Sequence, residues 1–182
     1  LCGNSKFRAL FEIRSNNALP QVPPSDYAWF HCASLGEYEQ AFPVIEAYIE
    51  SHPSTPILLT FFSPSGYNPV VKTPPSWFRE IDQICALPFD TPGRVRAFLK
   101  SVDYRIKFFA TCKYEVWPEL IKQLKNASIY TCIFSAHIPQ GSSLLRRSLV
   151  GKYLRWSWSK FSSILTQDSS SVEGLLSFHI SS

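Results

Sequence analysis

The chain has 182 residues, of which 45% are hydrophobic and 18% charged, and this composition indicates a packed globular protein and excludes a disordered tail. Its length predicts one domain with a core that folds without disulfide or metal staples. The formal net charge of +4 is too small to exclude any class of partner by itself.

The predicted elements alternate along the chain. Residues 1–27 are polar and proline-bearing, and we expect an arm followed by a loop. From Ala28 onward, short apolar runs alternate with amphipathic stretches, which is typical of βα units that feed a parallel sheet. The predicted strands are AWFHCA (28–33), ILLTFF (57–62), QICALP (83–88), IKFFAT (106–111), IYTCIF (129–134) and SSILTQ (162–167). Residues 28–182 are therefore expected to form an α/β domain, a Rossmann-like parallel sheet with helices on both faces.

The connections between these strands differ in character. Apolar residues at helical spacing predict crossover helices around 41–49, 95–102 and 120–124, and a further helix is expected to begin near Asp168. The segment NPVVKTPPSWFRE (68–80) is rich in proline, so we expect an irregular connection there.

The cysteines and the chain start bear on the type of protein. The five cysteines include no CxxC pair, and three lie inside apolar runs, which favours buried reduced thiols and a reducing compartment over disulfides or a metal site. No run of about 18 apolar residues is present, so no membrane span is predicted. Because the chain begins at Leu1 and contains no methionine, we expect it to be a piece of a longer protein.

The stretch HCASLGEYEQ (31–40) places an acid where the first strand passes into a helix. Glu37 falls in the first helical turn, where the helix dipole favours the ionised carboxylate, which could then accept a proton from a hydroxyl. Gly36 is expected to permit a left-handed or closely packed backbone. The alternative is that Glu37 only caps its helix.

Two other loops should meet Glu37 at the carboxyl edge of the sheet, where ligands bind in parallel α/β folds. The small residues Ser63–Gly66 follow the second strand and suit an approach of backbone amides to a polar ligand. Lys113 and Glu115 follow the fourth strand. Singly, these loops could be an ordinary turn and an ordinary helix start. Together they predict substrate-binding residues at Ser34, Gly36, Ser63, Ser65, Gly66, Lys113 and Glu115.

Four segments of the chain carry a family resemblance. They are WFHCASLGE (29–37), TFFSPSGY (60–67), LPFDTPGRVRAFL (87–99) and KYEVWPEL (113–120). In this order they resemble the N-terminal half of the 3-deoxy-D-manno-octulosonic acid (Kdo) transferases, over nearly the whole chain.

This resemblance implies the N-terminal, acceptor-binding domain of a GT-B glycosyltransferase that transfers Kdo from CMP-Kdo to the lipid A precursor with inversion. It implies no cofactor and no metal, with Glu37 as the general base and Glu115 positioning hydroxyl groups. The C-terminal domain that would bind CMP-Kdo and the family's membrane anchor are not in this sequence. The implied location is the cytoplasmic face of the bacterial inner membrane.

A basic and aromatic stretch, LLRRSLVGKYLRWSWSKF (144–161), contains no acid. Its cations Arg146, Arg147, Lys152 and Arg155 and its tryptophans suit contact with lipid phosphates at a membrane surface. A helix with one face packed on the sheet and solvated charges on the other is an equal alternative. No nucleic-acid-binding motif accompanies the stretch.

Two other functions stay open at this stage. One is a non-catalytic lipid- or phosphate-binding module of the same fold. The other is a GT-B enzyme that uses a different sugar nucleotide.

Overall fold

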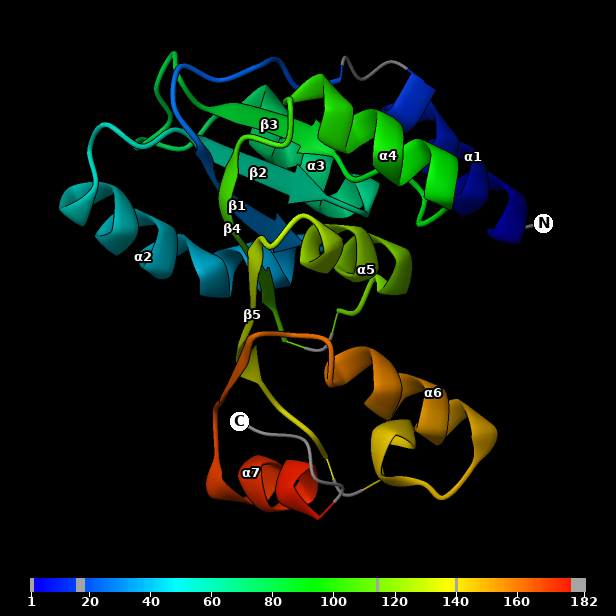
Figure 1. The fold of residues 1–182 in the computed structure, drawn as a ribbon. Coiled ribbons are helices and arrows are strands. Elements are labelled where there is room, and N and C mark those ends of the chain that lie inside the picture. Colours follow the sequence, from blue (N-terminus) through cyan, green and yellow to red (C-terminus); the bar gives the residue numbers. More distant parts are fainter. Residues whose placement is uncertain (1, 16–18, 114, 140, 178–182) are drawn as a thin grey trace.

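A six-stranded parallel sheet forms the centre of the molecule (Figure 1). The computed structural model describes residues 2–15, 19–113, 115–139 and 141–177. The strands are β1 (Tyr27–Cys32), β2 (Ile57–Phe61), β3 (Gln83–Ala86), β4 (Ile106–Cys112), β5 (Tyr130–Ala136) and β6 (Ser163–Thr166). All of the predicted strands are thus confirmed, with small differences at their ends.

The crossover helices predicted from apolar spacing around 41–49, 95–102 and 120–124 are confirmed, and further helices are present. The helices are α1 (Cys2–Ser15), α2 (Leu35–Ser51), α3 (Pro64–Lys72), α4 (Pro92–Ser101), α5 (Pro118–Asn126), the short 3-10 helix η1 (Ser143–Leu145), α6 (Leu149–Trp158) and α7 (Ser169–Leu176). The helix expected near Asp168 is confirmed, since the Asp168 carboxylate accepts a hydrogen bond from the Ser171 N–H and caps α7.

Two segments are more regular than expected. The N-terminal segment predicted as an arm is largely the helix α1, because Ile13 is buried and Arg14 bonds to carbonyl groups of other elements. The connection predicted as irregular over 68–80 begins inside α3, where capping by Ser63 and a proline at the first helical position set the helix start. Regular structure ends there at Lys72.

Helices cover both faces of the sheet, as predicted for the N-terminal domain of a GT-B fold. Apolar side chains of α2 and α3 pack with Phe30 on one face, and those of α4, α5, α6 and α7 pack with Trp29 on the other. The strand order is β3-β2-β1-β4-β5-β6, so the chain moves outward from β1 to β3 and then returns to β4 on the opposite side of β1. This reversal creates a topological switch point between β1 and β4, and ligands of such folds bind beside it at the carboxyl ends of the strands.

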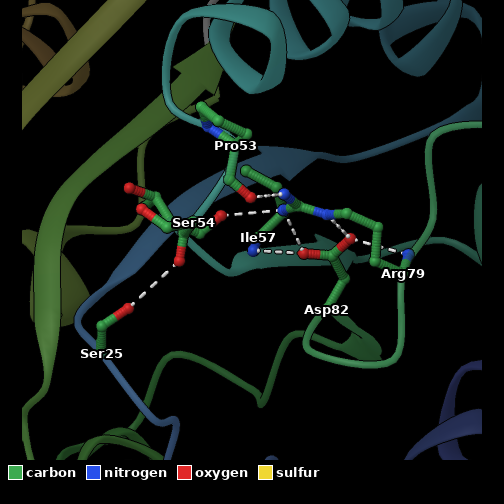
Figure 2. Close-up of polar contacts among 7 residues, drawn as sticks. Ser25, Pro53, Ser54, Ile57, Arg79 and Asp82 are labelled. Carbon is green, nitrogen blue, oxygen red and sulfur yellow. Dashed lines mark hydrogen bonds and ion pairs between the residues drawn. The ribbon is translucent and has the colours of Figure 1, made fainter.

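The amino ends of β2 and β3 are held together by a buried acid (Figure 2). Asp82, only 4% exposed, accepts hydrogen bonds from the backbone N–H of Ile57 and from the guanidinium of Arg79. The same guanidinium donates to the carbonyl oxygens of Pro53 and Thr55. Asp82 and Arg79 thus neutralise each other's charge, and backbone groups complete their hydrogen bonds. This pair lies at the edge of the sheet away from the switch point.

Candidate active site

Glu37 completes the cap of α2 at the switch point. Ser34 is the N-cap residue, in extended conformation, and Glu37 is the third residue of the helix. Its carboxylate oxygen Oε2 accepts hydrogen bonds from the backbone N–H of Ala33 and, at 3.2 Å, from that of Ser34. The cap therefore exists, and it fixes the direction of the carboxylate. Among the residues that the structure describes, the other oxygen, Oε1, has no hydrogen-bond partner.

The environment of Glu37 favours its protonated form more than the helix dipole alone would suggest. Glu37 is only 7% exposed, and this burial raises its pKa. The two backbone N–H donors and the charge of Lys113 act in the opposite direction without cancelling the effect of burial. We expected the dipole to favour the ionised form; burial outweighs it, and a pKa moved toward neutrality suits a proton acceptor.

The two glycines near the site have different roles from those expected. Gly36 lacks a positive φ angle, and a Cβ atom built there would meet nothing within 4 Å, so the expected need for a special backbone is wrong. Gly66 is the closely packed one, since its Cβ would lie 2.9 Å from the backbone carbon of Ser34 and 2.5 Å from Cδ1 of Phe61. Glycine at 66 lets α3 pack against the loop that carries Glu37.

The loop after β2 is bonded directly to the loop after β1. The backbone N–H of Ser63 donates to the carbonyl oxygen of Ala33 at 2.8 Å. The Ser63 hydroxyl accepts from the N–H of Ser65 and lies 2.8 Å from the Ser65 hydroxyl. The predicted turn is thus the start of α3, and its serines lie beside the loop of Ser34.

The loop after β4 brings a second acid and a cation to Glu37. Lys113 adopts a left-handed backbone, with φ of 66°, and its N–H donates to the carbonyl oxygen of Phe134 at 2.9 Å. Burial and the charge of Glu37 raise the pKa of Glu115 to about 7. Lys113 in turn lowers the pKa of Glu37. The structure therefore brings together Glu37, Lys113 and Glu115, from loops that are far apart in sequence.

The sequence of this chain matches a family model over residues 6–182. The family is described as 3-deoxy-D-manno-octulosonic-acid transferase (kdotransferase). The chain belongs to this family. Curated relatives named 3-deoxy-D-manno-octulosonic acid transferase support the assignment. The one from Haemophilus influenzae is 30% identical over 80% of this chain and 33% of its own length. The one from Bordetella pertussis is 29% identical with the same coverage, and the one from Aquifex aeolicus is 32% identical over 51% of this chain and 24% of its own length. This chain thus spans about a third of the length of the first two kdotransferases.

The four predicted lipid-contacting cations of this kdotransferase segment lie around η1 and α6. Arg146, Arg147 and Lys152 are exposed. The Arg155 guanidinium folds back and donates to the carbonyl oxygens of Leu144 and Arg146, at 2.6 and 2.9 Å. Among the described residues no hydrogen bond or ion pair joins this group to Glu37, Lys113 or Glu115.

A buried histidine was not singled out from the sequence. The imidazole of His31, in β1, is fully buried, and its Nδ1 lies 3.1 Å from the carbonyl oxygen of Thr60, which can only accept. Burial lowers the pKa of His31 to about 3, so the ring is neutral. The Trp117 ring packs perpendicular to it at 5.6 Å. The signal available in the sequence was a single histidine in an apolar run directly before the turn.

In the described part of the chain, no group of at least three histidine, cysteine, aspartate or glutamate side chains is arranged to hold a metal ion. No helix in the same residues combines the length and apolar character needed to cross a bilayer.

Proposed function

We propose that the protein carrying this chain transfers Kdo from CMP-Kdo to the lipid A precursor, and that this chain is the acceptor-binding half. Membership of the kdotransferase family supports the chemistry. The observation that carries the proposal for this half is the capped carboxylate of Glu37 at the switch point, with a second acid and a lysine within electrostatic reach.

In the proposed reaction Glu37 acts as the general base. Its Oε1 takes the proton of an acceptor hydroxyl, and the hydroxyl oxygen of the acceptor forms a bond to the anomeric carbon of Kdo. The bond from this carbon to the phosphate oxygen of CMP breaks at the same time, and CMP leaves as an anion. A single displacement of this kind inverts the anomeric carbon, and the proposal needs neither a metal nor a cofactor in this half. Gly36 leaves open space beside the base.

Lys113 and Glu115 have supporting roles in this proposal. The positive charge of Lys113 favours the ionised Glu37, which is the form that accepts a proton. Glu115, with its pKa near 7, is suited to donate or accept hydrogen bonds with hydroxyl groups of the sugar. Ser34, Ser63 and Ser65 belong to the adjoining loops and are proposed to contact the same substrate.

We also propose that α6 contacts the membrane surface at the cytoplasmic face of the inner membrane. Leu149, Tyr153 and Trp156 recur at helical spacing and are 87%, 52% and 47% exposed. The Lys152 ammonium belongs to the same helix, and Arg146 and Arg147 precede it. Exposed aromatic side chains beside cations favour a lipid interface over the alternative of a polar, merely solvated helix face.

The deciding experiment uses the intact protein with CMP-Kdo and a lipid A precursor. We expect a Kdo-bearing lipid and free CMP as products, and no transfer from UDP-sugars. Transfer from a UDP-sugar alone would indicate a different GT-B enzyme. Binding of the precursor without any transfer would indicate a non-catalytic binding module.

A further inference from the structure

A cavity with two arginines lies between α1, the end of β3 and α4. It has a volume of about 310 Å³. In Figure 1, α4 and α1 are drawn next to each other to the right of β3. Phe11, Pro88 and Phe98 contribute apolar walls. Arg14 and Arg94 are the charged residues of its lining within the described part of the chain, and no acid lines it there.

Arg14 is held rigidly at this cavity. Its guanidinium donates to the carbonyl oxygens of Leu10, Phe62 and Leu87, at 2.7, 2.9 and 2.8 Å. It also lies 4.4 Å from the ring centroids of both Phe62 and Phe89. Carbonyl groups and aromatic rings orient a cation but carry no net negative charge, so these contacts fix Arg14 without neutralising it.

Arg94 adds a second positive charge beside the first. Its guanidinium lies 5.1 Å from the same Phe89 ring. Burial, and then the charge of Arg94, lower the pKa of Arg14 to about 10, so the two cations repel each other.

The acids nearest in sequence bond elsewhere. The Asp90 carboxylate accepts from the backbone N–H groups of Glu119 and Leu120, and Glu12 pairs with Arg8. Among the described residues no ion pair is formed by Arg14 or Arg94. Two neighbouring guanidinium groups thus face one cavity without a counter-charge from the protein.

We propose that this cavity binds the phosphate group of a phosphate monoester. A dianion would relieve the repulsion between the guanidinium groups and accept their remaining N–H donors, which match phosphate geometry. The apolar walls favour an ester with a carbon group next to the phosphate over inorganic phosphate. This site is separate from Glu37 and does not depend on the proposed transfer reaction.

The test compares two variants of equal charge in the intact protein. Arg94→Gln removes a cavity guanidinium, whereas Arg96→Gln removes an exposed one from the same helix that lines a different pocket. Phenyl phosphate binding is measured by calorimetry, with a thermal melt to verify folding. We expect saturable binding that is about tenfold weaker in Arg94→Gln and within about twofold of wild type in Arg96→Gln.

Two outcomes would overturn the proposal: no saturable binding by the wild type, or equal weakening in both variants. A second arm uses phosphatidylcholine vesicles with and without phosphatidic acid. Vesicle binding that Arg94→Gln weakens and Arg96→Gln does not would support a lipid phosphate as the ligand. Arg94-dependent binding of phenyl phosphate without vesicle binding would support a soluble ester.

Discussion

The acids at the two ends of the parallel sheet differ in how far the protein supplies them with partners. At the amino ends of β2 and β3, Asp82 is buried but fully engaged by Arg79 and the Ile57 N–H. At the carboxyl ends of β1 and β4, burial raises the pKa values of both Glu37 and Glu115, and the charge of Glu37 raises that of Glu115 further. The charged groups of a structural ion pair have all their partners within the protein. Acids whose pKa values are raised by burial and by neighbouring charge are instead typical of functional sites.

The largest expected effect is on transfer activity, at the carboxyl end. Glu37→Gln in the intact protein keeps an oxygen that can accept from Ala33 and Ser34, so the cap and the fold should persist. Removing the proposed base should slow transfer by about 10³-fold, which is ~4 kcal/mol of activation free energy. The control Glu39→Gln changes an exposed acid on the same helix and should leave the rate unchanged. Substantial turnover by Glu37→Gln would exclude Glu37 as the base.

The second effect is on stability, at the amino end. Asp82→Asn leaves the Arg79 guanidinium without its counter-charge in a site where the Asp82 side chain is fully buried. We expect the free energy of unfolding to fall by about 3 kcal/mol, as measured by urea denaturation. Asp26→Asn removes the partner of Arg105 from a pair at 3.4 Å whose acid is 58% exposed, and should cost under about 1 kcal/mol. Similar losses in both variants would contradict the contrast.

The third effect separates the two glycines near Glu37. Gly66→Ala forces a methyl group against Phe61 and the Ser34 backbone, and should lower the free energy of unfolding by about 2 kcal/mol. Gly36→Ala meets open space within a helix and should be neutral or stabilising by about 0.5 kcal/mol. Thermal or urea unfolding of both variants measures the difference. A larger loss at Gly36 would refute this account of the loop packing.

The smallest effect is a pH dependence at Glu115. Because its folded pKa of about 7 lies above the ordinary value of 4.5, the folded state binds this proton more tightly than the unfolded state does. The resulting stabilisation is complete below about pH 4.5 and is lost as the pH rises through about 7. Glu115→Gln should remove this slope and, after allowance for solvent screening, stabilise the protein by roughly 1 kcal/mol at pH 8.

The matched variant for this pH dependence is Glu50→Gln, at an exposed acid near the end of α2. Unfolding free energies of the three proteins are compared between pH 5 and pH 8. A wild-type slope that Glu115→Gln leaves intact, or that Glu50→Gln removes equally, would contradict the assignment to Glu115.

Local sequence predicted the strands well because their apolar runs are buried on both faces, as in Trp29 and Phe30 of β1. The sequence also predicted that Glu37 and Glu115 lie at the same edge of the sheet, because both follow parallel strands and the carboxyl ends of such strands meet there. It missed α1, whose docking depends on Arg14 bonding to carbonyl groups of Phe62 and Leu87, far along the chain. The residues near the N-terminus alone do not indicate these distant partners.

The finer features of the site were also beyond local reasoning. Which glycine needs to be a glycine depends on the position of α3 against the first loop, so Gly66 and Gly36 could not be told apart by sequence. The upward shift of the Glu37 pKa depends on burial by neighbouring loops, whereas the helix dipole that predicted the other direction is a local effect. Side-chain environment, unlike strand pattern, is a property of the assembled fold.

The bond from the Ser63 N–H to the Ala33 carbonyl oxygen has a mechanical consequence. It ties the loop before Glu37 to the start of α3 and so limits the movement of Glu37. The loop of Lys113 is the one whose backbone occupies a rarely populated conformation. Any adjustment of the site should therefore come from the β4 side, and the Ser63 amide should exchange its hydrogen slowly.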